Sequence, residues 1–301
     1  MQATFGTLEG YLGVVERTAF RAACPLEGGA ASMGSSCGVV SGGCLSITLG
    51  HLGDMLSGGA GKGEALYGRL REYTSWFEGE FGSTLCRERC GADIKKFAGF
   101  MDYLFTGKVF SRCMAHIGDA ASRLVRMVDD PLEGAGEVTG LDERLAASGG
   151  YCAAEVMRGI REKTGYGSLY LEQLSVAFDG GVGLSGGLCG ALAGALLPLG
   201  LIWGIDPKKE GLAGTLVPFL RGHVNLYLDR HEPELWSVGN PFAREFKARF
   251  GSLECRNITG RSFATGEELA AFMPASSACA EIKDWCRKRA SELIISSTIF
   301  C

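Results

Sequence analysis

The chain has 301 residues, with 30 lysines and arginines against 34 aspartates and glutamates, and a formal net charge of -4. This length allows two domains of ordinary size, and the dispersed basic residues predict no surface for nucleic acid or for an anionic membrane. The first residues lack the basic and apolar regions of a secretory signal, so we expect a cytoplasmic protein. Because the cytoplasm is reducing, we expect its twelve cysteines to serve metal ligation, redox chemistry or packing, and not to form disulfides.

Helical periodicity dominates the first half of the chain. An apolar stretch rich in small residues at 36–53 predicts a buried helix among amphipathic ones. Alternating runs of valine, isoleucine and threonine bounded by hairpin turns are scarce, so the fold needs no strands. We therefore predict an all-α protein, with amphipathic helices in this half at 8–23, 64–80, 92–105 and 113–128.

The second half follows a predicted linker at 131–149 and is also helical. Its most apolar run, Leu188–Trp203, is too short to span a bilayer comfortably, and we predict a buried helix kinked at Pro198. No membrane contact is expected. Amphipathic helices are predicted around it at 152–163, 240–249 and 282–294.

Three cysteine motifs occur twice in the same order. SCGVVSG recurs as LCGALAG, each cysteine lying eight residues after a Gly-Gly pair; FGSTLCR recurs as FGSLECR, and SRC recurs as SAC. A repeat of this length indicates two copies of one structural unit. The matched cysteines are Cys37 with Cys189, Cys86 with Cys255, and Cys113 with Cys279.

The repeat predicts two homologous helical bundles, a first copy at 1–130 and a second at 150–301. Two such copies can pack as a pseudo-dimer within one chain. Cys189 and Cys255 are 66 positions apart, whereas Cys37 and Cys86 are 49 apart, which predicts an insertion of 17 residues in the second copy, around Leu226–Asn240.

Only the second copy has a fourth cysteine upstream, Cys152. Cys152, Cys189 and Cys279 are predicted at helix N-termini, where the pKa of a thiol falls, and Cys255 just beyond a helix end. Four thiols from separate elements can converge on one point and hold an iron-sulfur cluster or another thiophilic metal. The long spacing alone does not distinguish such a site from packing.

The second copy resembles the C_GCAxxG_C_C family of redox-active proteins over most of residues 148–297. The resemblance rests on SGGYCAA, the Gly-Gly pair leading to CGALAG, FGS followed by a cysteine, and a last cysteine. Leu188 and Gly190 depart from the residues in the family's name. The resemblance implies that the redox or cluster-binding residues are Cys152, Cys189, Cys255 and Cys279.

The first copy resembles the family more weakly. Cys37, Cys86 and Cys113 match three positions and form a candidate second site, but a counterpart of Cys152 is missing. Cys24, Cys44 or Cys90 could substitute only if the fold brings one of them close. We therefore expect a degenerate, mainly structural copy.

The leading hypothesis is a cytoplasmic redox protein with a cysteine-ligated metal centre in its second half, acting in electron transfer or reduction with an unidentified partner. If the protein is an enzyme, it is an oxidoreductase. Two alternatives remain open: a metal-free thiol-disulfide oxidoreductase, and a non-enzymatic binding or scaffold protein whose cysteines only pack.

Overall fold

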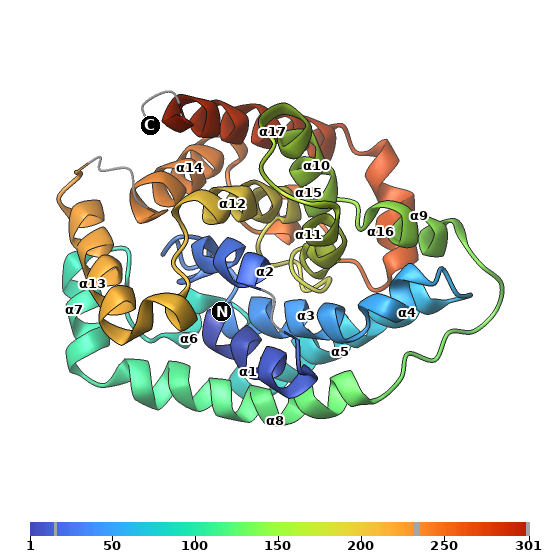
Figure 1. Ribbon diagram of the computed structural model, residues 1–301, viewed down its shortest axis with the longest axis horizontal. Helices are drawn as coiled ribbons and strands as arrows, with labels where there is room; N and C mark the ends of the chain where they lie inside the picture. The colour runs from blue at the N-terminus through green and yellow to red at the C-terminus, as the bar shows by residue number, and fades with distance from the viewer. Residues whose placement is uncertain (15–16, 231–234, 299–301) are drawn as a thin grey trace.

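The computed structural model describes residues 1–14, 17–230 and 235–298. It is 72% helical, and the described residues contain no strand (Figure 1). The predicted all-α duplication is therefore confirmed. The elements of the first half are α1 (Gln2–Leu12), α2 (Arg17–Ala22), η1 (Cys24–Leu26), α3 (Gly38–Gly50), α4 (Leu52–Leu56), α5 (Lys62–Phe81), α6 (Cys86–Arg89), α7 (Phe97–Phe105), η2 (Val109–Met114) and α8 (Ala115–Asp129).

The second half repeats this order after α9 (Gly140–Ser148), a helix within the predicted linker. Its elements are α10 (Ala153–Thr164), α11 (Leu169–Leu174), η3 (Ser175–Phe178), α12 (Gly190–Trp203), α13 (Pro207–Tyr227), α14 (Leu235–Phe250), α15 (Cys255–Thr259), α16 (Gly266–Phe272), η4 (Met273–Ala275) and α17 (Ser277–Thr298).

Helices α3 and α12 form the centre of the two halves. Each follows a cysteine, and equivalent helices of the two halves surround it. Helices α1, α5 and α8 pack on α3, and their equivalents α10, α14 and α17 pack on α12. The stretch Gly190–Gly211 is long and apolar enough to cross a membrane, but 67% of its 18-residue apolar window is buried inside the protein, as in a core helix.

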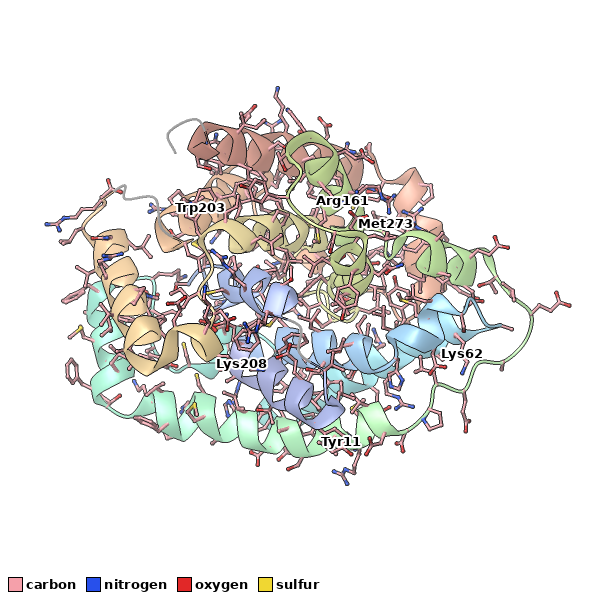
Figure 2. The ribbon with its side chains drawn as sticks, viewed as in Figure 1. Tyr11, Lys62, Arg161, Trp203, Lys208 and Met273 are labelled. Atoms are coloured by element: carbon pink, nitrogen blue, oxygen red, sulfur yellow. The ribbon has the colours of Figure 1, made fainter. Side chains whose placement is uncertain are left out.

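The two halves exchange segments. Helix α2 and η1 of the first half pack on α12, and η3 of the second half packs on α3 (Figure 1). Polar contacts also cross between the halves. Lys208 lies at the start of α13 (Figure 2) and forms an ion pair with Glu9 of α1 at 2.6 Å. Buried residues of both halves consequently form one continuous hydrophobic core.

The additional length of the second half lies in α13. This helix occupies the chain position of the short α4, between the central helix and the long helix that precedes the FGS motif. The insertion therefore begins earlier than Leu226–Asn240, and residues 231–234 of that predicted stretch lie outside the described residues. Helix α13 packs on α14 of its own half and also lies beside α7 of the first half (Figure 1).

Candidate redox site

Each of the four cysteines predicted in the second half lies at the start of a helix. Cys152 and Cys189 are the N-cap residues of α10 and α12, and Cys279 lies in the first turn of α17. Cys255 lies beyond the end of α14, as predicted, and also opens the short α15. The partial positive charge of a helix N-terminus favours a thiolate over a thiol.

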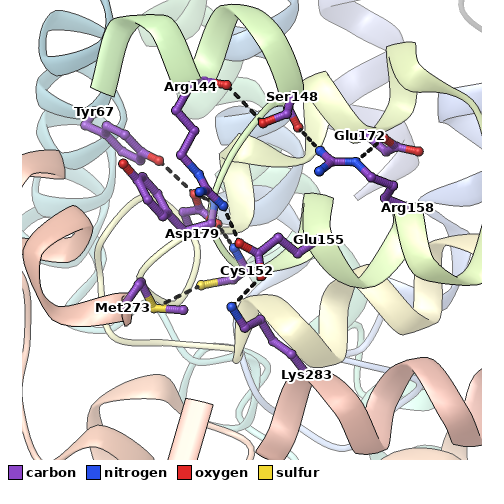
Figure 3. A network of polar contacts seen from close by, with 11 residues as sticks. Tyr67, Arg144, Ser148, Cys152, Glu155, Arg158, Glu172, Asp179, Met273 and Lys283 are labelled. Carbon is purple, nitrogen blue, oxygen red and sulfur yellow. Dashed lines mark hydrogen bonds and ion pairs between the residues drawn. The ribbon is translucent and has the colours of Figure 1, made fainter. Parts of the chain in front are cut away.

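The structure brings these four residues together. One small cavity of about 20 Å³ is lined by all four, Cys152, Cys189, Cys255 and Cys279. The other residues that line this cavity are mainly apolar. Three of them are buried and Cys279 is partly exposed. The side chain of Met273 fills part of the space, with its Sδ 4.0 Å from the Sγ of Cys152 (Figure 3).

Backbone pairing fixes the two central cysteines. Leu188 and Glu254 form an isolated β-bridge, in which the Cys189 N–H donates to the Leu253 carbonyl at 2.8 Å and the Cys255 N–H donates to the Gly187 carbonyl at 2.6 Å. The Cys189 sulfur accepts hydrogen bonds from the N–H groups of Ala191 and Leu192 in the first turn of α12. Such donors stabilise negative charge on sulfur.

A left-handed turn lies directly behind Cys255. Residues 180–184 all have positive φ angles between 57° and 87°, including the non-glycine residues Val182 and Leu184. A Cβ added to Gly181 would lie 2.7 Å from the Cβ of Cys255. Non-glycine residues rarely adopt this conformation, and consecutive ones still more rarely, so the surrounding core must hold the turn in place. Residues 28–32 repeat it in the first half.

Asp179 positions Cys152, and the sequence analysis did not identify it. Its buried carboxylate accepts hydrogen bonds from the N–H groups of Tyr151 and Cys152, at 2.7 and 2.9 Å, and from the Tyr67 hydroxyl of the first half at 2.7 Å (Figure 3). One sequence feature pointed to it: an acid precedes both Gly-Gly pairs, Asp179 in the second half and Glu27 in the first.

Burial raises the pKa of the three buried thiols of the site. It raises the pKa of Cys189 to about 11. Burial, followed by the charge of Asp179 and the other thiols, raises the pKa of Cys152 well above its usual value, and burial and the neighbouring thiols do the same for Cys255. A cation among these sulfurs would reverse this balance, because a coordinated thiol is deprotonated.

The donors suit a thiophilic group, but they are not arranged around a single ion. Among the described residues, no three side chains of His, Cys, Asp or Glu are placed to hold a metal ion. A cavity of about 20 Å³ has room for about one water molecule. A group of several atoms would therefore require Met273, a flexible side chain, to leave its place beside Cys152.

The first half brings its own cysteines together as well. Cys37, Cys86 and Cys113, the three predicted matches, line a second cavity of about 320 Å³. Cys90 lines it too, whereas Cys24 and Cys44 do not. Of the three substitutes considered from the sequence, the fold thus brings Cys90 close.

The comparisons with known proteins agree with this duplication. The family model described as "Putative redox-active protein (C_GCAxxG_C_C)" matches residues 1–127 and again residues 150–293. No curated protein and no solved structure matches the chain.

Proposed function

Because the chain belongs to the C_GCAxxG_C_C family of redox-active proteins, we propose that its second half holds an iron-sulfur cluster on the thiolates of Cys152, Cys189, Cys255 and Cys279. The protein would act in electron transfer or reduction, and a cytoplasmic location would keep the thiols reduced before assembly. The observation that carries the proposal is the convergence of four cysteines, from four separate helix N-termini, on one cavity.

The chain's own residues supply three things to such a cluster. The four thiols provide the ligands, the first turns of the long helices α10, α12 and α17 provide partial positive charge, and the N–H groups of Ala191 and Leu192 donate to a ligand sulfur. When bound, a cluster supplies reversible one-electron chemistry, with a potential tuned by such hydrogen bonds and by burial.

The raised thiol pKa values favour a metal centre over metal-free thiol-disulfide exchange at this site. Exchange requires a thiolate as the attacking group. With the pKa of Cys189 at about 11, that thiol is almost entirely protonated at pH 7. A metal removes this obstacle, because it binds the thiolate form directly.

The test is anaerobic preparation of the full chain with ferrous iron and sulfide, followed by iron and sulfide analysis, visible absorption and electron paramagnetic resonance. We expect alanine substitution of Cys152, Cys189, Cys255 or Cys279 to lower the iron content and change the spectrum. Cys286→Ala is the matched control, because this buried cysteine of α17 does not line the cavity. Full iron content in all four ligand variants would refute the proposal.

A further inference from the structure

We propose that the first half carries a second, polynuclear iron-sulfur centre, bound by Cys37, Cys86, Cys90 and Cys113, with Cys90 in place of the missing fourth cysteine of the repeat. This inference goes beyond the function proposed above and concerns different residues. It rests on the cavity of the first half, which those four cysteines line together.

The two central cysteines of the first half are held as in the second half. Ser36 and Leu85 form the equivalent β-bridge, the Cys37 N–H donates to Thr84 at 2.7 Å, and the Cys86 N–H donates to Ser35 at 2.6 Å. The Cys37 sulfur accepts from the N–H groups of Val39 and Val40 at the start of α3. Backbone geometry that orients ligand sulfurs is therefore present in both halves.

The fourth position has moved. A Cβ added to Gly190 would lie 2.7 Å from the Cβ of Cys152, and one added to the equivalent Gly38 would lie 2.6 Å from the backbone nitrogen of Met1. Met1 thus stands where the second half has its fourth cysteine.

Cys90 approaches the cavity from a different element. It follows α6, one turn after Cys86, and the side chains of these two cysteines are hydrogen-bonded to each other. Cys113 completes the set from η2, with its sulfur hydrogen-bonded to the Tyr103 hydroxyl. Four sulfurs are therefore available, from three separate segments, without a residue at the Cys152 position.

The size of the cavity points to a polynuclear group. In a tetrahedral site with metal-sulfur bonds of about 2.3 Å, the sulfurs lie only about 3.8 Å apart. The described residues contain no such gathering of three donors. Here the four cysteines line part of a cavity of about 320 Å³, against about 20 Å³ in the second half. This space accommodates a multi-atom cluster without displacing a side chain.

A helix of the second half lines one side of the cavity. Phe219 and His223 of α13 line it, and His223 stacks on Phe100 of α7 with ring centroids 4.5 Å apart. The Tyr227 hydroxyl ties α13 to the Ile94 carbonyl at 2.5 Å. A mainly apolar lining around a cluster tunes its potential.

The decisive experiment uses the full chain with the ligands of the second half removed. After anaerobic reconstitution with ferrous iron and sulfide, we expect Cys152→Ala/Cys189→Ala to retain about half of the iron and sulfide of the parent chain. Adding Cys90→Ala to this variant should abolish the remainder. Adding Cys44→Ala should not, because Cys44 is equally buried but does not line the cavity. Cys90→Ser serves as a second variant, and circular dichroism reports whether each variant is folded.

The outcomes separate the two proposals. Loss of all iron in Cys152→Ala/Cys189→Ala would overturn the second centre and leave the first proposal standing. Undiminished iron in a folded chain lacking Cys37, Cys86 and Cys90 but retaining the second-half cysteines would likewise overturn the second centre. A single bound ion without sulfide in the first half would overturn the polynuclear assignment. A parent chain without iron would overturn both proposals.

Discussion

Asp179 shows how one buried side chain can connect both halves with the site. Its carboxylate accepts hydrogen bonds from the backbone N–H groups of Tyr151 and Cys152 and from the Tyr67 hydroxyl of the other half. A buried donor that loses its acceptor costs more than the hydrogen bond itself contributes. The carboxylate is therefore both a structural and a positioning group for the first cysteine of the site.

Replacing Asp179 by Asn should destabilise the protein. The amide has only one acceptor oxygen, so at least one of the three buried donors is left unpaired, and we expect a loss of about 2 kcal/mol in the free energy of unfolding. Tyr67→Phe removes one donor and leaves the other two paired, so we expect the free energy of unfolding to fall by only about 1 kcal/mol. Urea unfolding of both variants measures the difference, and an equal loss in the two would contradict the role given to the carboxylate.

The left-handed turn behind Cys255 makes a similar comparison available. Gly181 and Gly251 both have positive φ angles, but a Cβ at Gly181 would meet Cys255 and the backbone, whereas one at Gly251 would meet nothing within 4 Å. Gly251→Ala should cost about 1 kcal/mol for the backbone conformation alone. Gly181→Ala should cost about 3 kcal/mol, because overpacking is added. Thermal denaturation of the Gly181→Ala and Gly251→Ala variants checks this. Similar melting temperatures would show that the turn can shift to accommodate the added Cβ at little cost.

The residues that the sequence identified and those that it missed differ in a physical way. Cys189, Cys255 and Cys279 belong to motifs repeated along the chain, and the family resemblance added Cys152, so the sequence itself pointed to all four. Cys90 is a candidate ligand only because it lines the same cavity as Cys37 and Cys113. It lies one helical turn after Cys86 but belongs to no repeated motif, so the sequence did not favour it over Cys24 or Cys44.

At the scale of elements, α13 is the main departure from symmetry between the halves. The spacing of the cysteines predicted an insertion of the correct size but placed it too late. A helix period does not reveal which neighbour a helix packs on, and α13 packs on α7 of the other half. The two central helices were easier to predict, since apolar residues fill almost their whole circumference.

Acidification should weaken the contact of α13 with the first half. Burial lowers the pKa of His223 to about 4, while its unfolded value is about 6.5. Between these values the unfolded chain binds a proton that the folded chain excludes, so stability falls as the pH drops from about 6.5 to 4. We expect His223 to lower the free energy of unfolding by about 3 kcal/mol over this pH range.

The measurement is urea unfolding as a function of pH, compared with His223→Gln, which cannot titrate. Carboxylates also titrate in this range, so only the additional loss in the parent chain belongs to His223. If both proteins lose the same stability between pH 6.5 and 4, the histidine is not excluded from protonation in the fold.

At the scale of the whole molecule, neither half has a core of its own. The exchange of α2, η1 and η3 places part of each half on the central helix of the other. Arg87 and Glu254 also form an ion pair of 2.8 Å beside the two β-bridges, and the Leu188 N–H donates to the Ser36 hydroxyl at 2.8 Å. A shared core of this kind predicts cooperative unfolding.

We therefore expect the full chain to melt in a single transition and residues 150–301 alone to aggregate or to unfold without cooperativity. Without the first half, the apolar face of α12 loses the cover of α2 and η1. Circular dichroism and size-exclusion chromatography test this, with co-expression of residues 1–149 as the control that should restore solubility. A soluble, monomeric fragment with a sharp transition would show that the halves fold independently.

The unequal cavities of about 20 and 320 Å³ have a genetic consequence. In a homodimer both sites come from one coding sequence, so every mutation alters them together. Two copies within one polypeptide remove this restriction. The lining of one cavity can then change while that of the other stays as it is. Fusion of the copies thus allows specialisation that a symmetric assembly forbids.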